Sequence, residues 1–278
     1  MRIIFLLLLS VFLFAAQPES DVVVKICIMP NSMHPTRDLQ TILEDFTKTH
    51  PHIKCLVTEQ SWEDAWVNLK FGSNVEDEID IVQIGSTWVG SIQSDGILFD
   101  LTPWVMRDLK PSNFLPAAWQ TSGISSLHQV VSIPWFLDPR AIYFRTDVFA
   151  KLGLTRKDLE TWERFEATLK TIKEAHLNID GQDVLPMGVP GKNDWNILHN
   201  LSPWIWSAGG DYLNQANTAS VLMTSEFMAG FSFYMGLVNR GFVDRASLLK
   251  NTIGVEQDFH QGKYALIVDG PNELQGIA

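Results

Sequence analysis

Apolar residues in the first hundred positions follow two alternating patterns. Val22 to Met29 is a nearly continuous apolar run, which is typical of a strand buried on both faces, as in a parallel sheet. The next segment has the spacing of one helix face, formed by Leu39, Ile42, Leu43 and Phe46. The same alternation predicts strands at 53–58 and 79–84 and helices at 62–71 and 88–93. Strands and helices that alternate with short connections predict an α/β domain with a central parallel sheet.

The second half of the chain has more helical pattern. Apolar residues at three- and four-residue spacing predict helices at 162–172, 197–207 and 227–238, and strands are predicted at 141–144, 185–189 and 264–268. Thr161 can cap the first of these helices, and Gly153 ends a short helix over 146–152. Pro134 and Pro139 exclude a helix just before the strand at 141. We therefore expect a domain boundary near residues 134 to 145.

The amino terminus has the pattern of a secretory signal peptide. Arg2 is followed by an apolar run from Ile3 to Ala16 that only Ser10 interrupts, and small residues end it. The run is shorter than the roughly 20 apolar residues that span a bilayer, although an uncleaved anchor is an alternative. Because no Cys lies just past the run, no lipid-anchor site is expected. We expect residues 1–16 to be removed and the mature protein to be soluble and periplasmic.

Charge and cysteine content narrow the possible partners. The net charge is −11, and without Arg2 the chain has 20 basic against 32 acidic side chains, or −12. An acidic chain repels phosphate backbones, so nucleic acid is not expected as a partner.

Cys27 and Cys55 fall on two predicted strands. A disulfide between them is one alternative, but neighbouring parallel strands rarely offer the geometry of a disulfide, which favours two buried free thiols. The 7 histidines show no metal-ligand spacing, so we expect no metal and no cofactor.

Aromatic and polar residues gather where ligands bind in open α/β sheets. Residues 29–32, 60–62 and 85–88 all follow predicted strands and belong to the same sheet edge. Trp135 lies close to Asp138 and Arg140, and Trp195 follows Asn193 and Asp194. Sugars present hydroxyls, which carboxylates, amides and Arg bind, and C–H faces, which flat rings cover. The 10 Trp residues of the chain suit such a ligand.

Six segments in order resemble the sugar-binding branch of extracellular solute-binding proteins, of the maltose and trehalose type, that serve ABC importers. The first is the segment S-I-P-W-F-L-D-P-R-A-I-Y-F-R-T-D-V-F-A-K-L-G over 132–153. The others are I-M-P-N-S at 28–32, W-E-D-A-W at 62–66, D-I-V-Q-I-G-S-T-W-V at 80–89, W-S-A-G-G-D at 206–211 and G-K-Y-A-L-I-V-D-G-P at 262–271. Where the family has Trp after the last G-P, this chain has Asn272.

The resemblance implies a two-lobed α/β periplasmic-binding-protein fold, each lobe a central sheet flanked by helices. It implies an N-terminal lobe at 21–134, a hinge crossover at 135–145, a C-terminal lobe at 146–263 and a second crossover at 264–278. Family members continue well beyond Ala278, so we expect the fold to be incomplete at its C-terminus and marginally stable. The implied ligand-binding residues are Asn31, Ser32, Trp62, Asp80, Trp88, Trp135, Asp138, Arg140, Trp195, Gly209, Gly210 and Asp211.

Several of these residues also have purely structural explanations. Trp66, Trp162 and Trp204 lie on predicted helices and suit packing, Asp80 can bond backbone at a strand start, and Gly209 with Gly210 can end a helix. The implied function is sugar capture by a monomer for a membrane permease, without covalent chemistry. A secreted glycoside hydrolase, which needs two carboxylates flanking the bond, and a sugar sensor for a membrane receptor are the alternatives.

Overall fold

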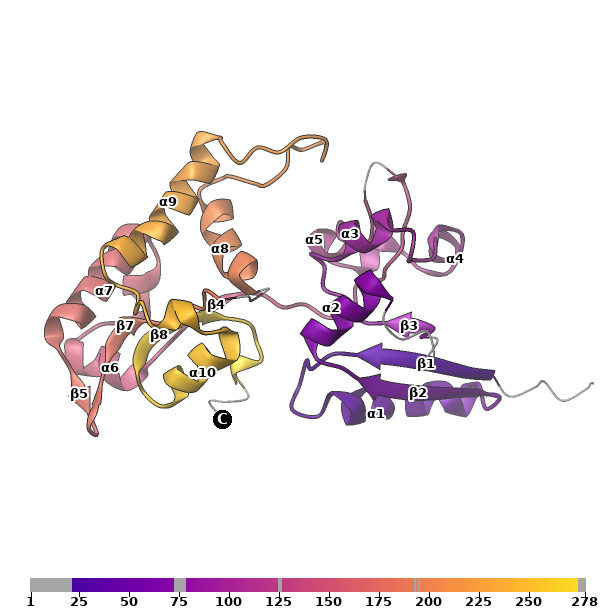
Figure 1. The fold of residues 1–278 in the computed structure, drawn as a ribbon, viewed down its shortest axis with the longest axis horizontal. Coiled ribbons are helices and arrows are strands. Elements are labelled where there is room, and N and C mark those ends of the chain that lie inside the picture. Colours follow the sequence, from indigo (N-terminus) through magenta and orange to yellow (C-terminus); the bar gives the residue numbers. More distant parts are fainter. Residues whose placement is uncertain (1–21, 73–78, 125–126, 193, 195, 275–278) are drawn as a thin grey trace, which may run out of the picture. The chain divides into compact units, whose positions relative to one another are not determined.

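The computed structural model describes residues 22–72, 79–124, 127–192, 194 and 196–274 (Figure 1). Contacts divide the chain into two compact units, one ending at Ile84 and one beginning at Gly85. In the described part of the chain, no helix is both long enough and apolar enough to cross a membrane. The predicted signal peptide lies outside the described residues.

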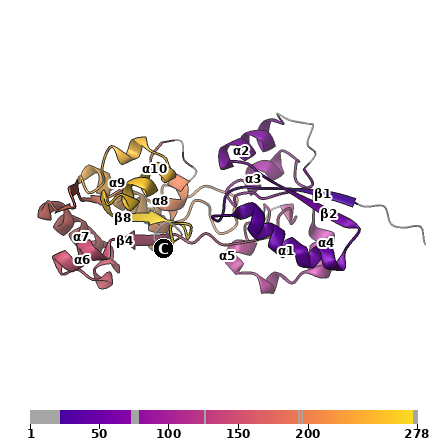
Figure 2. The ribbon, with the colours of Figure 1, turned by 90° about the horizontal axis from the view of Figure 1, so that it is seen from below.

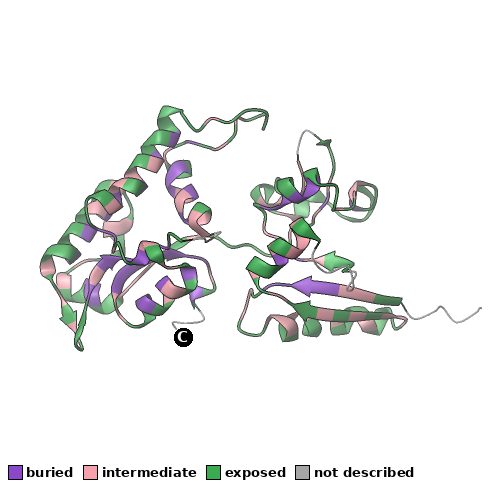
Figure 3. Ribbon diagram, in the orientation of Figure 1, coloured by how far each residue is buried: buried purple, intermediate pink, exposed green. Residues whose placement is uncertain are grey.

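The first unit contains a three-stranded parallel sheet. Its elements are β1 (Val22–Ile28), α1 (Pro35–Thr49), β2 (Ile53–Glu59), α2 (Trp62–Phe71) and β3 (Ile81–Val82). The strand order is β2-β1-β3, with β1 parallel to both neighbours. This confirms the parallel sheet that the apolar run predicts, although β3 is shorter than expected. β1 becomes buried in its second half (Figure 3).

The register of this sheet keeps the two cysteines apart. Cys27 lies opposite Thr58, whereas Cys55 lies opposite Val24. The cysteines are thus offset by three positions, or about 10 Å along the strands, which exceeds the reach of a disulfide. Both thiols are free, as predicted, but only Cys27 is buried and Cys55 is half-buried. Burial raises the pKa of the Cys27 thiol.

The second unit begins with short helices and continues into a mixed sheet. The helical part comprises α3 (Val89–Ser94), α4 (Thr102–Asp108), a 3-10 turn η1 (Pro111–Asn113) and α5 (Pro116–Trp119). The sheet order is β4-β8-β7, formed by β4 (Ala141–Phe144), β8 (Tyr264–Asp269) and β7 (Leu185–Met187). β4 runs antiparallel to β8, and β7 runs parallel to it. The remaining elements are α6 (Thr146–Leu152), η3 (Arg156–Leu159), α7 (Trp162–Ala175), the hairpin β5 (Asn178–Ile179) and β6 (Gln182–Asp183), α8 (Asn196–Ser207), α9 (Ser225–Asn239), η4 (Ser247–Leu249) and α10 (Thr252–His260).

Strand β8 is the centre of this unit because all six of its residues are buried. Leu266 and Val268 join a core cluster with Phe165 of α7, whereas Ile267 packs in a second cluster with Phe259 of α10. Helices α7 and α10 therefore cover opposite faces of the sheet, as Figures 1 and 2 show. The alternation of side chains along a strand explains this two-sided burial.

The predicted helices and strands of this unit are present, with boundaries that differ by a few residues. The Thr161 hydroxyl accepts a hydrogen bond from the Arg164 amide at 3.3 Å, which confirms the predicted cap of α7. Helices α4, α5 and α10 were not expected from the sequence. The sequence signals for α10 are its cap, Asn251, whose side chain accepts from the Gly254 amide, and the four-residue spacing of Val255 and Phe259.

Candidate functional site

In the first unit, the ends of β1 and β2 bring predicted site residues together. The Trp62 indole nitrogen donates to the Pro30 carbonyl at 3.0 Å, and Asn31 donates to the side-chain oxygen of Gln83 at 3.3 Å. That same Gln83 oxygen accepts from the Met29 amide at 3.2 Å. Asn31 and Trp62 are half-buried, so each keeps some exposed surface beside this edge. Gln83 was not predicted, and its only sequence signal is its place in the segment at 80–89.

Two other predicted residues in this unit bond to nearby structure. The Ser32 hydroxyl donates to Asp38 at 2.6 Å, in the first turn of α1. A carboxylate oxygen of Asp80 accepts from the Lys25 amide at 2.8 Å, so Asp80 holds the start of β3 against β1. This contact is the structural alternative considered for Asp80, and its part in ligand binding stays a prediction.

The predicted site tryptophans of the second unit differ sharply in exposure. Trp88 is only 2% exposed, and a side chain on Gly85 would begin 3.6 Å from its ring. The ring of Trp88 is therefore covered, and we leave it out of the proposed site. Trp135 is 49% exposed and meets Phe136 edge-on, with ring centroids 5.5 Å apart. Trp135 thus offers an open aromatic surface of the kind that covers a sugar face. Trp195 lies outside the described residues.

Arg140 organises the polar groups next to Trp135. Its guanidinium donates to Asp269 at 2.9 Å, to Asp138 at 3.1 Å and to Asn196 at 2.7 Å. The register of β4 against β8 places Ala141 opposite Asp269 and so brings Arg140 to this carboxylate. The Arg140 side chain is 7% exposed, whereas that of Asp138 is 49% exposed. The Asp138 carboxylate is therefore open to solvent, while its hydrogen bond to the buried Arg140 holds it in place.

The backbone turn after β8 leaves room for this arrangement. A side chain on Gly270 would begin against the nearer Asp138 oxygen, so a larger residue there would displace this carboxylate. The carbonyl of Gly270 accepts from the Tyr143 hydroxyl at 2.8 Å. Gly270 thus leaves the Asp138 carboxylate in the position that Arg140 holds.

His199 on α8 is a further polar group of this region that the sequence analysis missed. Burial lowers the pKa of its imidazole, and the positive charge of Arg140 lowers it further. The ring is therefore neutral at pH 7, and a neutral imidazole both donates and accepts hydrogen bonds. Such a group suits hydroxyl ligands.

The predicted residues at the end of α8 form a separate group. Trp206 is 57% exposed, and its indole nitrogen donates to Asp211 at 3.4 Å. Asn196 and Ser207 bound α8, whose 12 residues span about 18 Å, so this group does not meet the Arg140 cluster. The structure therefore does not bring all predicted residues of the second unit together.

Gly209 and Gly210 both have structural roles here. Gly209 has a φ of +82° and ends α8, which few other residues could do without strain. A side chain on Gly210 would begin 2.6 Å from the Phe227 amide, at the start of α9. The end of α8 therefore explains Gly209, and close packing against α9 explains Gly210. Their predicted contact with a ligand is not tested by these contacts.

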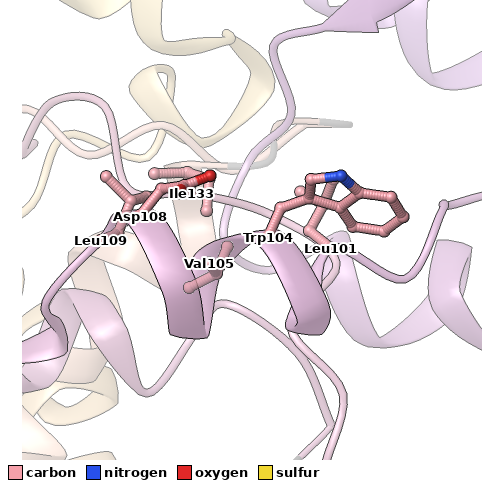
Figure 4. A pocket seen from close by; sticks show the side chains of 6 residues that line it. All are labelled: Leu101, Trp104, Val105, Asp108, Leu109 and Ile133. Carbon is pink, nitrogen blue, oxygen red and sulfur yellow. The ribbon is translucent and has the colours of Figure 1, made fainter.

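Two of the hollows among the described residues of the second unit lie near aromatic side chains. The larger has a volume of about 370 Å³ and extends from Arg140 along Ile142 and Val268 to Trp162 and Trp204. Trp162 and Trp204 are also part of the aromatic core around Phe233, as expected for packing. The smaller hollow has a volume of about 180 Å³ and lies on α4. Trp104 and Leu101 line one end of it, and Asp108, Leu109 and Ile133 line the other (Figure 4). It contains none of the predicted site residues.

Among the described residues, one group of carboxyls is spaced closely enough for a metal ion. Oxygens of Glu256, Asp269 and Glu273 lie within 4.8 Å of one another. Arg140 already bonds Asp269, and the His260 ring nitrogen lies 2.7 Å from Glu273. Because basic groups already face these carboxyls, we assign no metal to them.

Comparison of the sequence with known proteins identifies a matching family and a relative. Bacterial extracellular solute-binding proteins match residues 32–277. A probable ABC transporter-binding protein of Deinococcus radiodurans is 26% identical over 133 residues, which are 48% of this chain and 30% of that protein.

Solved structures share the fold. The sugar-binding protein MalE of Xanthomonas citri has a TM-score of 0.70 at 20% identity, covering 91% of this chain and 61% of its own. The ABC substrate-binding protein Lmo0181 of Listeria monocytogenes, in complex with cycloalternan, has a TM-score of 0.69 at 18% identity, covering 90% of this chain and 62% of its own. The chain thus spans about three fifths of these structures and has the α/β fold of two-lobed periplasmic binding proteins over that length. On the match over residues 32–277, the chain belongs to the family of bacterial extracellular solute-binding proteins.

Proposed function

We propose that the protein is the sugar-binding component of an ABC importer and captures a mono- or oligosaccharide for a membrane permease. The observation that carries the proposal is the exposed Trp135 ring beside an Asp138 carboxylate fixed by buried Arg140, in a chain of the solute-binding family. Similar structures include a sugar-binding protein and a complex with cycloalternan, which supports a carbohydrate ligand.

Each residue of the proposed site makes the contact with the sugar that its side-chain chemistry allows. Trp135 covers a C–H face of the sugar, and the Asp138 carboxylate accepts hydrogen bonds from sugar hydroxyls. Arg140 holds Asp138 in place and adds a charged donor. Asn31, Ser32, Trp62 and Asp80 serve the ligand from the first unit. The other predicted residues, Trp195, Gly209, Gly210 and Asp211, serve it from the segments before and after α8. No group in this scheme reacts with the ligand, so the proposed role is binding without catalysis.

The lobes are part of the same proposal. Residues 21–134 and 146–263 form two lobes, joined by crossovers at 135–145 and 264–278. The sugar favours the closed form through its higher affinity for that form, and the closed form docks on the permease. The protein acts as a monomer in the periplasm after removal of residues 1–16, and its net charge of −12 without these residues argues against nucleic acid as a partner.

The proposal is tested by thermal shift and calorimetry with maltose, trehalose, glucose and mannitol. A sugar at 100 times its Kd adds about 2.7 kcal/mol to the free energy of unfolding. Trp135→Ala should weaken binding about fivefold, for about 1 kcal/mol of lost ring contact. Asp138→Asn should weaken it about 10- to 150-fold, for about 1.5 to 3 kcal/mol from a charged hydrogen bond.

Matched controls are available on α4. Trp104 is 46% exposed, and the Asp108 side chain is 53% exposed and pairs with Arg107. Trp104→Ala and Asp108→Asn should leave the affinity unchanged. Equal affinities in all four variants would refute the proposed site. Turnover of an added oligosaccharide would instead support a hydrolase, and binding without a permease partner would support a sensor.

A further inference from the structure

Three carboxyl side chains meet behind Arg140, at the end of β8. Asp269 ends the strand and is 6% exposed, Glu273 follows in the next turn and is 2% exposed, and Glu256 comes from α10. Oxygens of all three lie within 4.8 Å of one another. The three carboxyls lie close together because α10 packs on β8 (Figure 1). The proposed function does not use Glu256 or Glu273.

The surroundings supply few positive charges. Arg140 bonds Asp269 at 2.9 Å, and His260 lies 2.7 Å from one oxygen of Glu273. The other oxygen of Glu273 is buried and has no hydrogen-bond partner in the described part of the chain. The further ionisable groups that face this cluster from β4 and the segments before β4 and α8 are Tyr143, Asp138 and Asp194, and His199 of α8 faces Arg140. Full ionisation would therefore crowd negative charge among largely buried side chains.

The carboxyl oxygens of Glu256 and Asp269 belong to this group and lie within 4.8 Å of each other. Two ionised carboxylates have only acceptor atoms and repel each other at such a distance, whereas one proton removes the repulsion and lets one carboxyl donate to the other. Burial and the charge of Asp269 raise the pKa of Glu256 from its ordinary 4.5 to about 8, and burial also raises the pKa values of Asp269 and Glu273. Asp269 keeps its contacts with Arg140 and the Gly270 amide, which suit an ionised carboxylate. Glu256 is thus the proton carrier.

We propose that Glu256 and Asp269 share one proton at neutral pH, and that loss of this proton at alkaline pH weakens the β4–β8 pairing that positions Arg140. The pair is a pH-sensitive element of the fold and is independent of which ligand the protein binds. Its protons come from solvent, so no cofactor is needed.

The sign of the pH dependence follows from linkage. Between about pH 4.5 and about pH 8, folded Glu256 holds a proton that the unfolded chain has released. The folded state is then favoured at low pH, and the free energy of unfolding falls as the pH rises through this window. One extra bound proton changes the folding equilibrium constant by up to about tenfold per pH unit.

The test compares the 278-residue chain with its Glu256→Gln variant by urea unfolding at several pH values from about 5 to 9. Gln keeps the shape and a donor group of the protonated carboxyl but does not ionise. The variant should match the parent near pH 5 and exceed its stability at pH 9, with a lower slope between. Glu163→Gln, on the exposed surface of α7, is the control and should run parallel to the parent.

Two other results would overturn the proposal. A Glu256→Gln variant that is destabilised equally at every pH would mean that Glu256 only fills space. Calcium chloride that raises the Tm of the chelator-treated parent, but not of the variant, would mean that a cation and not a proton holds the cluster. If the variant does not fold, the infrared C=O band of a protonated carboxyl in the parent decides. The band should be present at pH 6 and lost by about pH 9, and its absence at pH 6 refutes the proposal.

Discussion

Arg140 connects the parts of the candidate site that lie far apart in the sequence. It bonds Asp269, which is 129 positions away, and Asn196, which is 56 positions away. Its side chain and that of Asp269 are 7% and 9% exposed, so the ion pair is shielded from water. Removing one partner of such a pair leaves a buried charge without compensation.

We predict that Arg140→Gln lowers the free energy of unfolding by about 3 to 5 kcal/mol. Arg107→Gln is the matched control, because Arg107 and Asp108 pair at 2.6 Å with side chains 69% and 53% exposed. Loss of that exposed surface pair should change the free energy of unfolding little. Urea unfolding at pH 7 measures both values. The loss for Arg140→Gln should shrink at acidic pH, where Asp269 is protonated; equal losses for the two variants would contradict the role of Arg140.

At the scale of elements, α8 and α9 pack closely at a glycine. A side chain on Gly230 of α9 would begin 2.5 Å from the Ile205 Cα and 2.4 Å from the Trp204 carbonyl. These are backbone atoms of α8, which cannot move without shifting the helix. The close contact between α8 and α9 therefore requires a residue without a side chain at position 230. The apolar pattern of α9 alone does not predict this requirement.

Gly230→Ala should therefore destabilise the protein by about 1 to 3 kcal/mol through overpacking. Gly236→Ala is the control on the same helix, because its side chain would meet only the flexible end of Arg240. Alanine favours a helix over glycine by up to about 1 kcal/mol, so this variant should be neutral or more stable. Thermal unfolding of both variants measures the difference, and similar Tm values would show that the α8–α9 contact is loose.

At the scale of the whole molecule, apolar side chains remain uncovered in both units. Ile42 of α1 is 61% exposed, Leu56 of β2 53%, Phe71 of α2 74% and Phe99 67%. Helix α1 has no buried residue at all. Exposed apolar surface costs roughly 25 cal/mol per Å² relative to burial, so such surface favours association.

We predict that the chain without residues 1–16, a monomer when dilute, self-associates as its concentration rises, with its apolar faces as the contact. Size-exclusion chromatography with light scattering measures this. The double variant Ile42→Gln with Phe71→Ser should associate less, whereas Lys48→Gln, at an exposed α1 position, should not differ from the parent. A parent chain that remains monomeric at high concentration would contradict the prediction.

The sequence by itself determined most elements, because they depend on local patterns. The apolar run of β1, the cap of α7 at Thr161 and the strand β8 were predicted and are present. The six ordered segments also identified the family that the match over residues 32–277 shows. Local periodicity and short motifs need no knowledge of distant contacts, which is why they could be found in this way.

Tertiary structure alone decided which of the predicted residues meet. Trp88 and Trp135 both follow apolar or extended segments, yet one is 2% and the other 49% exposed. Gln83, His199 and the Glu256–Asp269 pair were missed because their partners lie on other elements. Strand register and helix packing set those contacts, and a slip of one residue would turn each side chain to the other face. The sequence pattern determines the elements, but the packing between them determines the charges, the exposed rings and the hydrogen bonds of the site.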